Sequence, residues 1–142
     1  MITVRGLALA PSNPSVLVAV TRSGVFRSSD EGESFSRISP RDHTALKLVG
    51  SVAIDPRNDQ SIMVGTARLA WRTDNGGATW RPIQQGMIND SDVMTLNVDR
   101  REPTTVFATA CTGIWRSRNS GGSWTKVLGI PSVSRRTRAF AQ

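Results

Sequence analysis

The sequence contains one motif three times, and this repeat limits the possible folds more than any other feature. Segments 26–35, 71–80 and 115–124 align without gaps as FRSSDEGESF, WRTDNGGATW and WRSRNSGGSW. The spacing is 45 residues from Asp30 to Asn75 and 44 residues from Asn75 to Asn119. A regular period of this length is typical of architectures in which each repeat is one supersecondary unit stacked on its neighbours.

The segments between the motifs are expected to form short β-strands. Apolar and β-branched runs at 7–11, 52–56 and 96–100 are followed by similar runs at 16–20, 62–66 and 106–109, with turn residues between them. No window has a 3.6-residue apolar period, so helices are not expected. Each repeat therefore predicts four short strands in about 45 residues, a period typical of propeller blades.

Within each motif, a short loop is expected to be fixed by its own side chains. Asp or Asn at the fifth position can accept backbone N–H groups further along the chain, and a Ser or Thr hydroxyl can bind the same loop. The glycine supplies a position that tolerates positive φ, and the closing aromatic residue is expected to anchor packing between blades. The residues given this structural role are Ser28, Asp30, Gly32, Phe35, Thr73, Asn75, Gly77, Trp80, Ser117, Asn119, Gly121 and Trp124.

These loops resemble the Asp-box, or BNR, repeat Ser-x-Asp-x-Gly-x-Thr-Trp, and the resemblance covers nearly the whole chain. The fuller pattern is similar to bacterial propellers of the sialidase-like superfamily, among them sialidases, xyloglucan-cleaving glycoside hydrolases and the photosystem II assembly-factor type. The resemblance implies four-stranded antiparallel blades with the box between the third and fourth strands. Asn75 and Asn119 replace the Asp but keep its acceptor oxygen, so the turn should survive.

We therefore predict an all-β fold, a partial β-propeller of three four-stranded antiparallel blades plus one extra strand. The chain is expected to be a single partial propeller over 1–142, with blades at about 1–39, 46–85 and 92–128 and the first strand of an incomplete fourth blade at 133–142. Because propellers need about four blades to close, we expect either a fragment or a ring completed by self-association.

Composition excludes several classes of protein. The longest apolar runs have only the length of a strand, so a transmembrane helix and a membrane partner are not expected. The N-terminus lacks the pattern of a signal peptide, although resembling families are often secreted or periplasmic, and localisation stays open.

Cys111, expected to be half-buried, is the single cysteine, and His43 is the single histidine. Neither a disulfide framework nor a metal site or other cofactor is therefore expected.

The positive charge is concentrated near the C-terminus. Residues 1–102 contain 12 Lys or Arg and all 11 Asp and Glu, whereas residues 103–142 contain six Lys or Arg and no acid. A basic surface that binds nucleic acid or another anionic polymer is one interpretation. The absence of a known docking module or aromatic platform argues against nucleic acid.

Ligands are expected on the face of the propeller opposite the box loops. The resemblance implies that binding or catalysis uses this face or the central channel, and the links between blades contribute the polar side chains to it. The candidates are Asp42, His43, Asp90, Asp92, Arg135 and Arg136.

Three functions remain open from the sequence. The first hypothesis is a non-catalytic scaffold, or a module that binds a protein or a glycan. The second is a fragment of a glycoside hydrolase, in which Asp42 and either Asp90 or Asp92 would supply two carboxylates across a sugar. Sialidase chemistry, by the resemblance, would need a tyrosine nucleophile, and the chain has no tyrosine. The third hypothesis is the basic surface.

Overall fold

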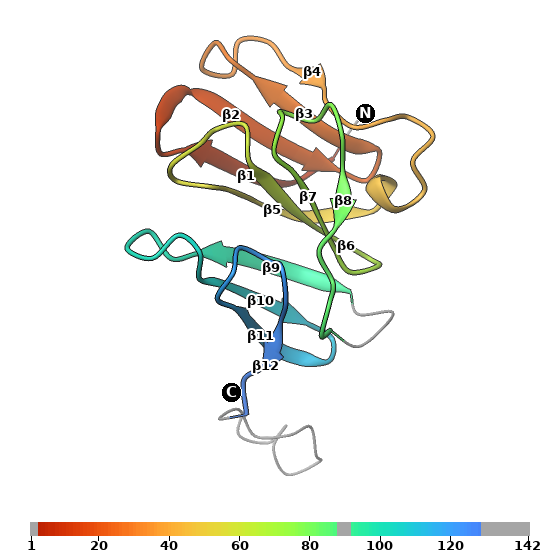
Figure 1. Ribbon diagram of the computed structural model, residues 1–142. Helices are drawn as coiled ribbons and strands as arrows, with labels where there is room; N and C mark the ends of the chain where they lie inside the picture. Colours follow the sequence, from red (N-terminus) through yellow and green to blue (C-terminus); the bar gives the residue numbers. More distant parts are fainter. Residues whose placement is uncertain (1–2, 88–91, 129–142) are drawn as a thin grey trace, which may run out of the picture.

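The computed structural model describes residues 3–87 and 92–128, which form three four-stranded antiparallel sheets (Figure 1). Blade 1 contains β1 (Val4–Ala10), β2 (Asn13–Thr21), β3 (Gly24–Ser28) and β4 (Ser36–Arg37). Blade 2 contains β5 (Val49–Ile54), β6 (Ile62–Thr66), β7 (Ala70–Thr73) and β8 (Arg81–Pro82). Blade 3 contains β9 (Val93–Val98), β10 (Val106–Ala110), β11 (Gly113–Ser117) and β12 (Thr125–Lys126).

The all-β fold and the three blades predicted from the repeat are confirmed. Strands within each blade are hydrogen-bonded in chain order, and a 3₁₀ turn, η1 (Ala45–Lys47), is the one helical element of the described part. No helix there is long and apolar enough to cross a membrane. The extra strand at 133–142 lies outside the described residues, and the predicted domain boundaries stay a prediction.

The blades are stacked in order, and their first strands lie together. In Figure 1 the three sheets follow one another from top to bottom, and β5 contacts both β1 and β9. Because both faces of blade 2 are covered, every residue of β6 is buried. Ile62 and Val64 belong to the core shared with blade 1, while Met63 belongs to the core shared with blade 3. The period of two along a strand thus divides its side chains between two cores.

Each box loop (28–35, 73–80 and 117–124) is closed by side-chain hydrogen bonds that recur in all three blades. In blade 3 the Ser117 hydroxyl donates to Asn119 Oδ1 and accepts from the Gly121 N–H, both at 2.8 Å. Asn119 Oδ1 also accepts from the Ser123 N–H at 2.8 Å. Blades 1 and 2 contain the same bonds. The amide oxygen of Asn therefore replaces a carboxylate oxygen, as expected.

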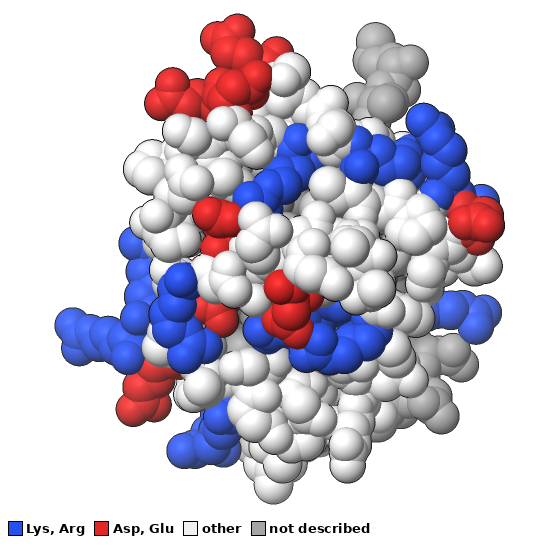
Figure 2. Space-filling model, turned by 45° about the horizontal axis from the view of Figure 1, so that its top comes forward, with Lys and Arg blue, Asp and Glu red and all other residues white. Residues whose placement is uncertain are grey.

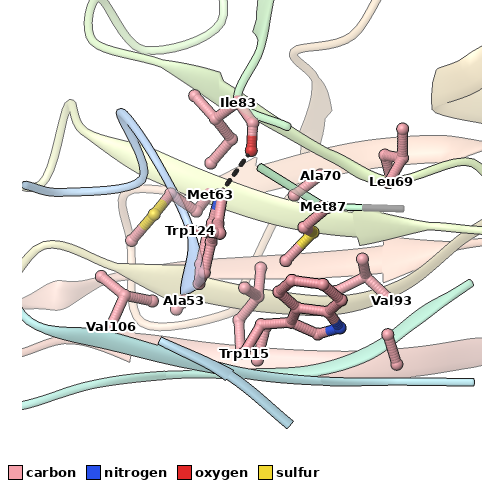
Figure 3. Packing of buried hydrophobic residues seen from close by; sticks show 13 residues of the cluster. Ala53, Met63, Leu69, Ala70, Ile83, Met87, Val93, Val106, Trp115 and Trp124 are labelled. Atoms are coloured by element: carbon pink, nitrogen blue, oxygen red, sulfur yellow. Dashed lines mark hydrogen bonds between the residues drawn. The ribbon is translucent and has the colours of Figure 1, made fainter. Parts of the chain in front are cut away.

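The box loop of each later blade packs on the outer part of the blade before it. Trp80 Nε1 donates to the Ile38 carbonyl at 3.1 Å, and Trp124 Nε1 donates to the Ile83 carbonyl at 2.7 Å (Figure 3). Trp124 is buried in the core between blades 2 and 3. These contacts confirm that the tryptophans of the boxes pack between blades.

Phe35, the closing aromatic residue of the blade 1 box, has a side chain that is 43% exposed. Phe35 holds the position of Trp80 and Trp124, but no described blade precedes blade 1. Its ring therefore has no neighbouring blade to cover it. Phenylalanine also lacks the N–H group that the two tryptophans donate across their junctions.

Gly77→Ala is expected to lower the free energy of unfolding more than Gly32→Ala. Both glycines have positive φ, 103° and 91°, so each alanine carries a backbone cost of about 1–3 kcal/mol. At Gly77 the added Cβ would also lie 2.3 Å from the Ile38 carbonyl oxygen, whereas at Gly32 it would meet no atom within 4 Å. Urea unfolding should show a further loss of about 1–3 kcal/mol for Gly77→Ala. Equal losses of stability in the two variants would contradict the close contact between Gly77 and Ile38.

Candidate functional site

The face opposite the box loops is formed by the second-to-third-strand turns and by the links between blades. In blade 2 the Ala67 N–H donates to the Leu48 carbonyl at 3.1 Å, and in blade 3 the Cys111 N–H donates to the Asp92 carbonyl at 3.3 Å. Each turn therefore holds the end of the link that leads into its own blade. We call this surface the turn-and-link face.

The structure places three of the six predicted ligand residues. Asp42 and His43 lie in the link before blade 2, and Asp92 lies in the link before blade 3. Asp90, Arg135 and Arg136 lie outside the described residues. The side chains of Asp42 and Asp92 are exposed. Among the described residues, no three His, Cys, Asp or Glu side chains are grouped so that they could hold a metal ion.

His43 stabilises the link before blade 2. Its Nδ1 accepts a hydrogen bond from the Leu46 N–H at 3.4 Å, and its ring packs edge-on against Trp71 with 4.7 Å between centroids. Leu46 is fully buried in the core between blades 1 and 2. The histidine thus fixes the turn that directs Leu46 into this core, a role that the sequence did not indicate.

Next to this link lies a hollow of about 470 Å³. Its lining is mostly aliphatic and contains one hydroxyl and one guanidinium group. The lining residues are Thr44, Ala45, Leu48, Ala67 and Arg68. Leu48 is 47% exposed, and Arg68 is exposed and makes no ion pair with a described residue. An apolar surface beside one free cation suits a ligand with an apolar group near an anionic one.

The turn that presents Arg68 is held by side-chain hydrogen bonds and contains an unusual backbone conformation. The Thr66 hydroxyl accepts from the Arg68 N–H and donates to the Leu69 carbonyl, both at 2.9 Å. Leu69 has a φ of 67°, where the corresponding turns have Gly24 and Gly113. This conformation costs about 1–3 kcal/mol for a non-glycine residue, which burial of the Leu69 side chain offsets by a similar amount.

The hollow was not predicted from the sequence, although the sequence contains one signal for it. In the aligned repeats, glycine stands at the third residue after Thr21 and Ala110, whereas leucine stands there after Thr66. A leucine at a glycine position marks the blade 2 turn as different from its equivalents.

Cys111 lies in the turn between β10 and β11, as expected, but its side chain is exposed rather than half-buried. The corresponding position in blade 2 is Ala67, which lines the hollow. At this position a turn residue faces solvent because its backbone, rather than its side chain, contacts the link.

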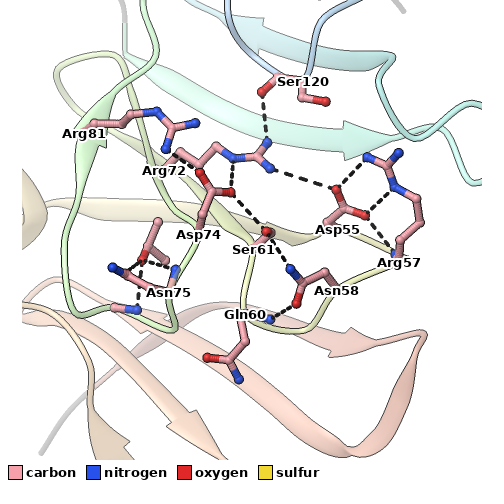
Figure 4. A network of polar contacts seen from close by, with 12 residues as sticks. Asp55, Arg57, Asn58, Gln60, Ser61, Arg72, Asp74, Asn75, Arg81 and Ser120 are labelled. Carbon is pink, nitrogen blue, oxygen red and sulfur yellow. Dashed lines mark hydrogen bonds and ion pairs between the residues drawn. The ribbon is translucent and has the colours of Figure 1, made fainter.

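The carboxylates near the box loops are occupied by structural contacts (Figure 4). Asp74 accepts from Arg72 Nε at 2.8 Å and from the Ser61 hydroxyl at 3.0 Å, and it also pairs with Arg81. Arg72 is buried and extends to blade 3, where its Nη1 donates to the Ser120 carbonyl at 2.9 Å. The network therefore joins two blades.

A second arginine joins blades 1 and 2 at the equivalent position. Arg27 donates to the Asp59 carbonyl at 2.6 Å and to Asp59 Oδ1 at 2.8 Å. The hydrogen bond from Arg27 is the main cause of a lowered pKa at Asp59. Partial burial alone would raise the pKa of Asp55, but hydrogen bonds from Arg57 outweigh it and the pKa is lowered.

Two further carboxyl groups have strongly lowered pKa values. Hydrogen bonds from Ser34 and then Ser28 lower the pKa of Asp30 to about 2. Burial opposes ionisation of Asp74, but hydrogen bonds from Arg81 and Arg72 lower its pKa to about 2. A glycosidase acid needs a carboxyl group whose pKa is raised. In the four described carboxyl groups whose pKa departs from its usual value, the pKa is lowered instead.

No protein-family model and no curated protein sequence matches the chain. Solved structures of similar fold do match. The GH74 enzyme of Niastella koreensis is 22% identical with a TM-score of 0.71, over 89% of this chain and 22% of that one. YCF48 from Cyanidioschyzon merolae is 17% identical with a TM-score of 0.69, over 93% of this chain and 38% of that one.

A third similar structure is YCF48 bound to D1 peptide, which is 13% identical with a TM-score of 0.64. It is matched over 87% of this chain and 40% of its own. The chain thus spans less than half the length of each of these three propeller proteins. At such identities the likeness shows the β-propeller fold alone.

The Asp74 carboxylate is expected to stabilise the folded chain only while it is ionised. Because its pKa is lowered from 3.8 to about 2, this stabilisation is fully present above about pH 4 and is lost as the pH falls toward 2. Asp74→Asn should therefore lower the urea midpoint at about pH 6 and lower it less at about pH 2.5.

Asp42→Asn is the control for that experiment, because it removes an exposed carboxylate that makes no ion pair with a described residue. It should change the midpoint little at either pH. An effect of Asp74→Asn that did not depend on pH would contradict stabilisation by the charged contacts.

Proposed function

We propose that this chain is a non-catalytic β-propeller segment that binds a protein partner through the turn-and-link face. The hollow beside Leu48 and Arg68 is the observation that carries the proposal. It would receive an apolar side chain of the partner on Leu48, with a carboxylate of the same partner on Arg68. The three box loops favour placing the chain among the Asp-box, or BNR, propellers of the sialidase-like superfamily.

The size and lining of the hollow support a peptide ligand. About 470 Å³ is within the range of roughly 300–1,000 Å³ of small-ligand sites and accommodates one or two side chains. No carboxylate is among the lining residues, so an acidic group on the ligand meets no like charge there. The hydrogen bonds of Thr66 fix the backbone at Arg68, which limits the ordering cost of binding.

A propeller of similar fold gives independent support. YCF48 has been solved bound to D1 peptide, so this scaffold can present a peptide site. At 13% identity, no binding residue of YCF48 can be assigned to this chain. Our proposal of peptide binding therefore rests on the hollow of this chain itself.

A fragment of a glycoside hydrolase is the second candidate, favoured by the likeness to GH74 enzymes. Asp42 and Asp92, two of the acids proposed for it, are exposed and belong to different links. The third candidate is a basic surface for nucleic acid or another anionic polymer. It rests on Arg135, Arg136 and Arg138, which lie outside the described residues.

Arg68→Glu is expected to weaken peptide binding by about tenfold or more, because it places a carboxylate against the anionic group of the ligand. The probe is a set of fluorescein-labelled decapeptides in which leucine and glutamate are adjacent, measured by fluorescence anisotropy. Leu48→Asp should give a similar loss, since it removes the apolar surface of the hollow.

Arg22→Glu is the matched control, because Arg22 is an exposed arginine in the equivalent turn of blade 1 and does not line the hollow. It should leave the affinity nearly unchanged. Equal losses of affinity in Arg22→Glu and Arg68→Glu would show that the effect comes from net charge and not from the hollow. Cleavage of xyloglucan or β-glucan by the purified chain would contradict a non-catalytic role.

A further inference from the structure

The two junctions between blades use equivalent apolar residues. Each blade therefore has a trailing face, which contacts the next blade along the chain, and a leading face, which contacts the blade before it. On the trailing face, Val18 of blade 1 and Met63 of blade 2 occupy the same repeat position and are at most 2% exposed. Ile38 and Ile83 likewise occupy one position, and each accepts the indole N–H of the next box loop. The junction is thus a repeated contact with defined partners.

Blade 3 has the same trailing face, but no described residue covers it. Phe107 holds the position of Met63 and is 38% exposed. Val127 holds the position of Ile83, since its N–H donates to β11 as that of Ile83 donates to β7. Ile114, next to them on β11, is also partly exposed.

Arg116 gives a second observation at this face. The equivalent residues Arg27 and Arg72 each donate to a carbonyl of the following blade. Arg116 Nε is buried and has no hydrogen-bond partner among the described residues. The equivalent Arg72 Nε is satisfied within its own blade by Asp74, and blade 3 has Arg118 at that position. The Nη groups of Arg116 are therefore the atoms that would reach an acceptor across this face, as those of Arg27 and Arg72 do.

Blade 1 presents an uncovered leading face. Leu9 holds the position of Ile54 but is 61% exposed, whereas Ile54 is buried against blade 1. Leu7 and Phe35 are also exposed there. Nothing lies within 4 Å of the Cβ position of Gly32, although the equivalent Gly77 touches Ile38. This face has the features of the half-junctions that blades 2 and 3 use.

We propose that the trailing face of blade 3 binds the leading face of blade 1 of a second copy of this chain, head to tail. The contact would repeat the two internal junctions. Phe35 of one copy would lie on Val127 of the other, and Leu9 would lie near Phe107. Because the two surfaces differ, the contact is heterologous and closes a ring if the rotation permits it. This inference goes beyond peptide binding and does not rest on it.

Charge favours a second copy as the occupant. The box loop of blade 1 exposes Asp30, Glu31 and Glu33, none of which makes an ion pair with a described residue. Blade 3 carries Arg116, Arg118 and Lys126, and residues 103–128 contain no acid. In Figure 2 one group of acidic side chains lies at the upper left corner of the drawn face, and smaller acidic groups lie among basic side chains elsewhere.

The junction between blades 2 and 3 shows how these charges would meet. Arg72 of blade 2 donates to the carbonyl of Ser120 in the box of blade 3. Glu31 holds the position of Ser120 in the box of blade 1. A second copy would therefore bring the backbone and carboxylate of its Glu31 to Arg116.

Light scattering coupled to size-exclusion chromatography, on the 142-residue chain at about 1–100 µM, tests the proposal. The mass should rise with concentration to at least twice the 15.4 kDa of one chain. Arg116→Glu and Glu31→Arg should each weaken association by about tenfold or more. The double variant should restore it, because the two reversed charges would again be opposite across the contact.

Arg100→Glu is the control, since it reverses an exposed charge in blade 3 away from the trailing face and should not alter the mass. Near-ultraviolet circular dichroism of every variant checks that the blades remain folded. A monomer over the whole concentration range would overturn the proposal. A monomer is also the result expected if further blades of a longer chain, rather than a second copy, cover these faces. Association unaffected by either reversal, or not restored in the folded double variant, would also overturn it.

Discussion

The hydrogen bond from a box tryptophan to a carbonyl of the preceding blade is the contact on which the rest of the structure depends. A single four-stranded blade has two apolar faces and cannot bury both alone. The box loop solves this by presenting an indole N–H and a glycine, without a Cβ, to the blade before it. Trp124 is buried in doing so, and its N–H reaches the Ile83 carbonyl at 2.7 Å. Stacking therefore gains apolar burial without leaving the polar end of the ring unsatisfied.

This use of the box loops divides the molecule into two ends with different roles. At the box end, side chains such as Arg72 and Asp74 are occupied by ion pairs and backbone contacts that join blades. Hydrogen bonds from Arg81 and Arg72 lower the pKa of Asp74, which makes this carboxyl group a poor proton donor near neutral pH. At the other end, the turns contact the links mainly through their backbone, so side chains such as Arg68 and Leu48 stay free. Binding function is accordingly expected at the second end.

Much of the fold could be predicted from the sequence, but little of the candidate site. The repeat predicted the strands, the blades and the bonds within the loops, because Ser117, Asn119 and Gly121 interact within four residues of one another. The hollow could not be predicted in the same way. Its walls come from a link and a turn about twenty residues apart, and the solvent exposure of Leu48 depends on how they meet. His43 was noted as a polar residue, and only its packing on Trp71 shows a structural role.

The sequence by itself determined the repeating unit and the chemistry of its loops, since those contacts are local and every repeat contains all of their partners. Only the tertiary structure decided which of three equivalent residues is covered. Trp80 and Phe35 occupy one repeat position, yet the first reaches a carbonyl 42 residues away and the second is exposed. The physical reason is that burial depends on a neighbouring blade. The sequence of a repeat specifies the surface it offers, and stacking specifies whether that surface meets a partner.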